Sequence, residues 1–190
     1  MPYRRSVFFL ILLVATAAPT DAAPVELGPV GGVVVSADTK TVIVSSPADG
    51  VLRYYDAESE KEVKKVEVDF QPLALALQGK RLFASTKGAA VVHVLDSATG
   101  KETKTIKIPG EPIVELACHP TKGLLYATNS ADEVYSIDPE TGKTTKTKAR
   151  GQRIVVDPKE GKFVYTGIQK PIKDQLMVEE GDGKRVRLSL

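Results

Sequence analysis

The chain has 190 residues, with 26 Lys or Arg against 24 Asp or Glu, so its formal net charge is +2. Hydrophobic residues make up 42% and charged residues 26%, values that are typical of a globular domain and exclude a disordered or collagenous chain. A single Cys excludes an intrachain disulfide framework, and the near-balanced charge argues against a dedicated nucleic-acid binder. We therefore expect a domain stabilised by its apolar core, with no nucleic-acid partner and no cofactor.

Residues 1–23 have the composition of an export signal. Arg4 and Arg5 form a positive region, an apolar run follows over residues 7–18, and small residues come next. The run is shorter than the roughly 20 residues that a membrane-spanning helix needs, so we expect cleavage and no stable membrane span, with an uncleaved anchor as the alternative. The sequence therefore predicts general secretory export to the periplasm, the cell surface or the extracellular medium.

Residues 24–190 carry four copies of one short motif at a nearly constant spacing. The motif is an acidic residue, three variable residues, Gly and Lys. It begins at Asp96 and Asp138 in its strong form and at Asp56 and Glu179 in a weaker form. Successive first positions are 40, 42 and 41 residues apart. The chain is therefore a set of repeats of about 40 residues, which is the length of one β-propeller blade.

We interpret the motif as a turn. The Asp carboxylate can accept backbone N–H bonds, and Gly100 and Gly142 supply the positive φ that a tight hairpin requires. A phosphate or metal site is the alternative, but turn geometry already explains why the motif recurs in each unit.

Each unit contains short segments rich in β-branched and aromatic residues, separated by turn-forming residues. Four strands in a unit of this length are typical of propeller blades. We therefore predict an all-β fold, a β-propeller of about four four-stranded antiparallel blades in an open or partial ring. The expected units are residues 28–68, 69–108, 109–150 and 151–190. The last strand of each unit is rich in Lys and Thr, which predicts a solvent-exposed rim.

Residues 124–143 resemble the YVTN-type β-propeller repeat, named for a Tyr-Val-Thr-Asn string. Tyr-Ala-Thr-Asn at 126–129 stands where that string belongs, and His-Pro-Thr-Lys-Gly at 119–123 stands where the family has a Pro-Asp-Gly turn. The resemblance extends over residues 28–190, with departures such as Glu60 in place of the motif Gly. It implies an exported propeller, often at a cell surface or in the periplasm, but no particular function, because this fold carries scaffolds, receptors and enzymes.

The sequence contains few His and Cys residues that could act in catalysis or bind a metal. We expect His93 to be a packed strand residue and His119 to be a turn residue. Cys118 precedes His119, but neighbouring strand residues point to opposite faces, so a nucleophile and base pair is not expected. No metal-ligand spacing appears. The basic stretch at residues 143–153 is interpreted as a solvated rim strand, with an anionic polymer site as the alternative.

A ligand site in a propeller would lie on the loops that surround the channel at one face. These loops join the outer strand of one blade to the inner strand of the next, or the second strand of a blade to its third. We select five candidate binding residues that differ between blades: Asp69, Glu111, Asn129, Asp132 and Arg153.

Without a catalytic set, the sequence favours a non-catalytic binding or scaffold module whose partner is a protein or a cell-envelope polymer. The alternative is a propeller hydrolase or lyase, similar to a lactonase, with a metal in the central channel. An open arc would expose apolar blade faces, so we expect either self-association that completes the propeller or a chain that is a truncated piece of a longer propeller.

Overall fold

The computed structural model describes residues 29–157, 163–165, 175–179 and 185–189. Within these residues all regular structure is β-strand, and 16 strands form four antiparallel sheets of four strands each. The expected export signal at residues 1–23 lies outside the described residues, and so does most of the fourth motif copy, at residues 180–184.

Within every sheet the strands follow chain order. The first sheet contains β1 (Val33–Val35), β2 (Thr41–Ser46), β3 (Val51–Asp56) and β4 (Glu62–Glu67). The second contains β5 (Pro72–Gln78), β6 (Arg81–Thr86), β7 (Val91–Asp96) and β8 (Glu102–Lys107). The third contains β9 (Ile113–Cys118), β10 (Leu125–Asn129), β11 (Glu133–Ile137) and β12 (Thr144–Arg150). The fourth contains β13 (Ile154–Val156), β14 (Phe163–Tyr165), β15 (Gln175–Glu179) and β16 (Arg185–Ser189).

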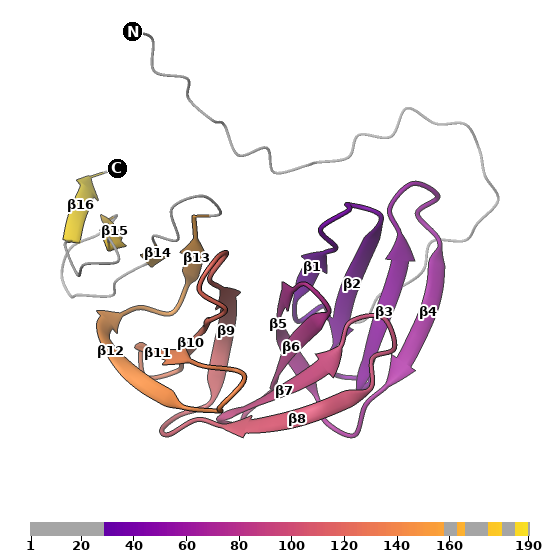
Figure 1. Ribbon diagram of the computed structural model, residues 1–190, viewed down its shortest axis with the longest axis horizontal. Coiled ribbons are helices and arrows are strands. Elements are labelled where there is room, and N and C mark those ends of the chain that lie inside the picture. The colour runs from indigo at the N-terminus through magenta and orange to yellow at the C-terminus, as the bar shows by residue number, and fades with distance from the viewer. Residues whose placement is uncertain (1–28, 158–162, 166–174, 180–184, 190) are drawn as a thin grey trace, which may run out of the picture.

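The four sheets follow one another along an arc (Figure 1), and we call them blades one to four. The first strands lie on the inside of the arc, where β1 contacts β5, β5 contacts β9, and β9 contacts β13. The strands β4, β8 and β12 lie on the outside. This arrangement confirms the predicted all-β propeller fold with four-stranded antiparallel blades.

The hydrophobic core lies between blades, so each blade is apolar on both faces. Ile43 and Leu52 of blade one pack with Leu75, Leu82 and Leu95 of blade two. A second cluster joins blades two and three and a third joins blades three and four. Burial on both faces explains why the inner strands read as continuous apolar runs.

The outer strands are exposed because nothing packs outside them. In β4, β8 and β12, buried or half-buried positions alternate with exposed ones, and Lys and Thr occupy most of the exposed ones. Charged side chains on an edge strand discourage pairing with another sheet. The predicted solvent-exposed rim is therefore present in the first three blades.

The repeated motif forms the turn between the third and fourth strands. The carboxylate of Asp96 accepts hydrogen bonds from the backbone N–H and the hydroxyl of Thr99, both at 2.7 Å. Gly100 has a φ of 75° and Gly142 one of 77°, as the turn interpretation requires. Glu60 holds the same place in blade one and adopts a φ of 57°, although it has a side chain.

A row of buried hydroxyl groups links the blades near the inner strands. The Ser45 hydroxyl accepts the N–H of Gly32 at 2.7 Å and donates to the Leu73 carbonyl of the next blade, also at 2.7 Å. A Cβ on Gly32 would lie 2.8 Å from the Leu75 backbone nitrogen, so only glycine permits this close approach. Thr128 of blade three repeats the link by donating to the Gln152 carbonyl at 2.6 Å.

Candidate functional site

In the first three blades, the third residue of the third strand is paired with a carboxylate. Arg53 donates to Glu62 at 2.8 Å in blade one, and His93 Nδ1 lies 2.8 Å from Glu102 in blade two. In blade three the Tyr135 hydroxyl donates to Glu133 at 3.0 Å. Glu62 and Glu102 begin the fourth strands of their blades, whereas Glu133 begins the third strand of blade three. The contact is therefore part of the repeat in blades one and two, and blade three forms its own version of it.

His93 illustrates this structural use. Its Nε2 lies 2.9 Å from the Thr86 hydroxyl, and the Phe70 ring stacks on it with 3.6 Å between ring centroids. The carboxylate, imidazole and hydroxyl are ordered as in a hydrolase triad. However, Phe70 covers the imidazole, of which only 12% is exposed, and no substrate could reach its stacked face. His93 is thus a packed strand residue, as the sequence predicts.

Among the three carboxylates Glu62, Glu102 and Glu133, Glu133 has the most side-chain partners. It pairs with Lys146 and accepts hydrogen bonds from the Asn129 amide and the Tyr135 hydroxyl, each at 3.0 Å. These partners, Lys146 first, lower the pKa of Glu133 to about 2. A carboxylate with its acceptor sites satisfied in this way is suited to holding structure rather than to exchanging protons.

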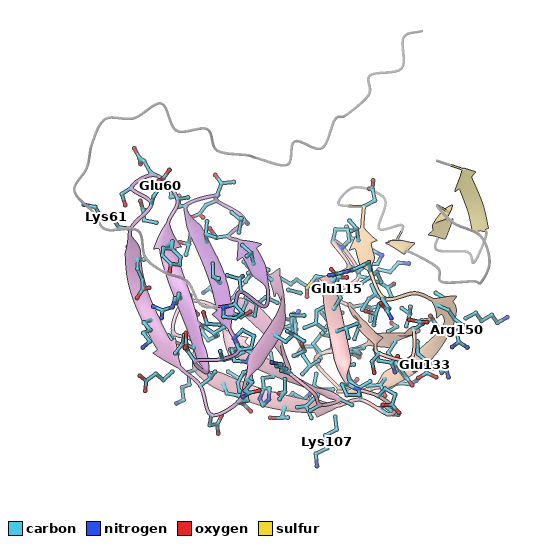
Figure 2. All side chains as sticks on the ribbon, turned by 180° about the vertical axis from the view of Figure 1, so that it is seen from behind. Glu60, Lys61, Lys107, Glu115, Glu133 and Arg150 are labelled. Carbon is cyan, nitrogen blue, oxygen red and sulfur yellow. The ribbon has the colours of Figure 1, made fainter. Side chains whose placement is uncertain are left out.

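Glu115 breaks the repeat. It lies on the inner strand β9 directly opposite Thr128, the register position that Gly32 holds in blade one and Ala74 in blade two. Figure 2 shows Glu115 beside β9 toward the inside of the arc. The side chain is 27% exposed, and desolvation raises the pKa of its carboxyl group. Blade three therefore places a protonatable acid where blades one and two have Gly32 and Ala74.

Two groups of blade four surround this carboxyl group. The backbone N–H of Ile154 donates to Glu115 Oε2 at 3.3 Å, and the Arg153 guanidinium lies 3.8 Å from the same oxygen. Arg153 is one of the five candidates selected from the sequence, and 76% of its side chain is exposed. Both interactions stabilise the ionised form of Glu115, but burial outweighs them and the pKa remains raised.

Two other candidates, Asn129 and Asp132, form the turn between β10 and β11. Asn129 is fully buried, and its side-chain oxygen accepts the N–H groups of Ala131 at 3.1 Å and Glu133 at 2.9 Å. Asp132 has a φ of 63° and its carbonyl accepts the N–H of Gly151 at 2.9 Å. Asn129 thus faces its own turn rather than a ligand.

The remaining candidates, Asp69 and Glu111, lie on exposed loops. Asp69 lines a groove of about 360 Å³ formed by the end of β4 and the turn between β7 and β8, away from Glu115. The loop of Glu111 lies beside the turn of Asn129 and Asp132, because the Pro112 carbonyl accepts the N–H of Ser130 at 3.0 Å. The sequence analysis missed Glu115, although an acid within the apolar run Ile-Val-Glu-Leu-Ala was a signal that could have found it.

Cys118 and His119 do not form a dyad. Burial raises the pKa of the Cys118 thiol to about 12, which keeps it protonated. The Nδ1 of His119 accepts the N–H groups of Thr121 at 3.2 Å and Lys122 at 3.1 Å, so this ring caps its own turn.

Over the described ranges, no three His, Cys, Asp or Glu side chains gather as metal ligands would. The same part of the chain contains no helix that is long and apolar enough to cross a membrane.

Comparison with known proteins decides the family. Residues 31–179 match the family model described as glutamine cyclotransferase. The chain belongs to the glutamine cyclotransferase family. This is an enzyme family with a β-propeller fold, whereas the YVTN repeat as such is not what the comparison identifies.

Membership of the glutamine cyclotransferase family corrects the functional expectation. The sequence analysis favoured a non-catalytic scaffold, and that expectation is wrong. Its alternative, an enzyme, has the better support, although the family is not a lactonase family. The error has a physical cause: the chain carries no local catalytic motif, whereas an acid and its neighbours can be brought together from separate blades.

Several solved structures superpose on this chain of the cyclotransferase family and support its β-propeller fold. Hydrazine synthase of Kuenenia stuttgartiensis superposes with a TM-score of 0.70 at 18% identity, over 90% of this chain and 53% of that one. The Cps50 (Swd1) β-propeller domain of Myceliophteria thermophila gives 0.66 at 14% identity, over 86% and 55%. A chain of a mitotic checkpoint complex gives 0.67 at 16% identity, over 84% and 51%. The chain thus spans about half the length of these structures, and a search of curated proteins finds no match.

Proposed function

We propose that this protein cyclises glutamine at the N-terminus of a peptide or protein. In this reaction the α-amine attacks the side-chain amide carbon, a five-membered lactam ring closes, and ammonia leaves. The family match over residues 31–179 carries the proposal. Glu115 supports it, because such a reaction needs a group that moves protons and Glu115 is an inner-strand carboxyl with a raised pKa.

In this proposal Glu115 acts as a general acid and then as a general base. The protonated carboxyl donates its proton to the departing amide nitrogen as the carbon–nitrogen bond breaks. The carboxylate so formed accepts a proton from the amine nitrogen that has bonded to the same carbon. Ammonia and the lactam are then the only products, and the carboxyl group returns to its starting state. A raised pKa suits this role, since it keeps the acid form populated closer to neutral pH.

Arg153 has a supporting role in the same proposal. Its guanidinium lies 3.8 Å from Glu115 Oε2, so its positive charge stabilises the carboxylate that forms during proton transfer. Its high exposure leaves the remaining N–H donors free to approach the substrate carbonyl oxygen, on which negative charge develops.

The test is ammonia release from a peptide that begins with glutamine, with the lactam product identified by mass spectrometry. We expect the full chain to be active and Glu115→Gln to lower kcat/KM by about 10²- to 10⁴-fold, the usual contribution of a general acid or base. Glu58→Gln is the control, because it removes an exposed carboxylate from the turn between β3 and β4, a position with no proposed role in binding or catalysis. It is expected to keep full activity.

The possible results test the cyclase activity and the role of Glu115 separately. An inactive wild-type protein with native thermal unfolding would overturn the cyclase proposal itself. An active wild-type protein with an equally active Glu115→Gln variant would leave the reaction standing and refute the role of Glu115. Arg153→Gln should also displace the alkaline limb of the pH profile toward higher pH, because the pKa of Glu115 rises further when its carboxylate loses a stabilising charge and the acid form then persists to higher pH.

We also propose that the protein is exported and that residues 1–23 are removed. Support comes from the arginine pair, the apolar run and the small residues that follow in that segment. N-terminal sequencing of the protein recovered from the periplasmic or extracellular fraction should read from Pro24. An intact N-terminus in the cytoplasmic fraction would contradict export.

A further inference from the structure

A groove with a volume of about 360 Å³ lies between the outer strand of blade one and the outer part of blade two. One wall is the end of β4 with the residues that follow it, and the other is the turn that leads into β8. Figure 1 shows the end of β4 beside the start of β8. The volume is at the lower end of the range for ligand sites, ~300–1,000 Å³, so the groove has room for a short piece of a ligand.

The floor of the groove is apolar. Val66, Val68 and Phe70 are half-buried and pack against the cluster that joins blades one and two. Leu95 of that cluster also lines the groove. The motif residue Gly100 lies so close that a Cβ there would be 2.8 Å from a methyl carbon of Val66. Part of each half-buried side chain is therefore open to the groove and suited to packing against an apolar group.

Three carboxylates and one ammonium group line the same groove. Glu67 and Asp69 are exposed on the β4 side, and Lys101 and Glu102 lie on the β8 side. Desolvation opposes the ionisation of Glu102, but the hydrogen bonds that it accepts from two neighbouring side chains lower its pKa below the ordinary value. With three negative charges against one positive charge, the lining has a net charge of −2 at neutral pH.

The propeller fold does not require acids at the β4 side of the groove. Glu67 and Lys107 hold the same register position at the ends of β4 and β8. Asp69 and Pro109 each come two residues later. The boundary between blades two and three is thus built with a cation and a proline where the boundary between blades one and two has two carboxylates. The acids are therefore a particular feature of this groove rather than of the repeat.

The carboxylates on the β4 side remain accessible to a ligand. The Lys65 ammonium lies 3.9 Å from Glu67, and 85% of the Glu67 side chain is exposed. A surface ion pair this long contributes little, so it competes weakly with a ligand cation. Asp69 is exposed as well.

We propose that the groove binds an arginine side chain on an extended segment of a partner protein. Arginine combines an apolar stem with a planar guanidinium group, and the groove combines an apolar floor with carboxylates at its rim. The stem packs on Val66, Val68 and Phe70. The guanidinium donates hydrogen bonds to the carboxylates, for which its paired N–H groups have the right geometry. A lysine fits less well, because its ammonium group is a single, strongly hydrated point of charge.

A protein segment is a better occupant than a metal ion. In the part of the chain that the structure describes, no three His, Cys, Asp or Glu side chains come close enough to share a metal ion. The groove carboxylates are instead spread over two walls, which suits a larger cation. In addition, β4 is the last strand of its sheet, so an extended segment can approach along its edge. The proposal does not depend on the cyclase activity.

The probe is the fluorescein-labelled peptide Val-Ala-Arg-Ala-Val, titrated with the full-length protein and followed by fluorescence anisotropy. We expect saturable binding that weakens as the salt concentration rises. A peptide with Gln in place of Arg is expected to bind at least tenfold more weakly. The Glu67→Gln, Asp69→Asn double variant should bind the Arg peptide roughly three- to tenfold more weakly, because two exposed charge contacts are lost. Its affinity for the Gln peptide should not change.

The matched control is the Glu58→Gln, Glu60→Gln double variant. It removes the same charge from an exposed turn of blade one that does not line the groove, so it should bind the Arg peptide like the wild type. Equal weakening in both double variants would overturn the proposal, because total charge rather than the groove would then govern binding.

Two further results would also contradict the proposal. The first is an absence of saturable binding of the Arg peptide by wild-type protein with native thermal unfolding. The second is competition by arginine amide at the same concentration as the unlabelled peptide, since the occupant would then be a small free cation. Light scattering covers the remaining alternative: a wild-type dimer that the Glu67→Gln, Asp69→Asn variant dissociates would identify the occupant as a second copy of this chain and overturn a different partner.

Discussion

Two glutamates of blade three show how the surroundings of a side chain decide what it can do. Glu133 is held by Lys146, Asn129 and Tyr135, and its pKa falls to about 2. Glu115 has one backbone N–H and a more distant guanidinium as partners, and burial raises its pKa. The first glutamate is therefore a fixed charge that ties strands together. The second keeps its proton to a higher pH than an ordinary glutamate does.

Glu133 should make the stability of the protein depend on pH in the acidic range. Its pKa is lower in the folded than in the unfolded state, so its contribution is present above the unfolded value of 4.5 and is lost as the pH falls toward about 2. Glu133→Gln should therefore lower the unfolding temperature above that range and flatten its decline within it. Thermal unfolding at several pH values measures this. Glu111→Gln serves as the control, and an unchanged pH dependence in Glu133→Gln would contradict the assignment.

At the scale of the element, the repeated turn explains both the periodicity of the sequence and its exceptions. The turn requires a left-handed residue in the position before the motif Lys, and blades two and three use Gly100 and Gly142. Blade one keeps the conformation with Glu60, at a φ of 57°. Figure 2 shows Glu60 and Lys61 together at the tip of blade one, far from Glu115. The strands on both sides thus impose the turn even where the residue does not favour it.

Glu60→Gly should stabilise the protein. Glycine removes the strain of the left-handed conformation, which costs about 1–2 kcal/mol in a residue with a side chain. Glycine also loses more conformational entropy on folding, so the net gain in unfolding free energy is about 0.5–1 kcal/mol. Urea unfolding measures the change. Glu60→Ala removes the same carboxylate but keeps a Cβ, so it should give no such gain. Equal stabilisation by both variants would mean that charge, rather than backbone strain, is responsible.

At the scale of the whole molecule, stability comes from contacts between blades rather than within them. Each sheet is only one layer thick, and the core clusters lie between consecutive blades. The hydroxyl of Ser45 adds a link by bonding to the Leu73 carbonyl of the next blade. The blades are therefore expected to unfold together, because removing one exposes the faces of its neighbours.

Phe83→Ala should test this coupling. Phe83 is fully buried in the cluster that joins blades two and three, so the variant should lose about 3–5 kcal/mol of unfolding free energy. Circular dichroism in urea should show one transition at a lower midpoint. Val63→Ala, which truncates a side chain that is 62% exposed, should leave the midpoint nearly unchanged. Two separate transitions in Phe83→Ala would show that the blades unfold independently.

The sequence by itself determined the strands, the turns and the propeller fold. These features depend on residues close together in the chain, such as the Asp96 carboxylate and the Thr99 N–H. The same local pattern then repeats in each unit, which makes it visible without a structure.

Only the tertiary structure decided which polar residues meet. Glu115 and Ile154 are 39 residues apart and come from different blades, so no local sequence pattern predicts the hydrogen bond between them. Asn129 and Asp132 looked like channel-facing ligands on loop position alone, but Asn129 bonds back into the turn that they share. The direction in which a loop side chain points depends on the neighbouring blade, and that neighbour is set by the packing of the whole arc.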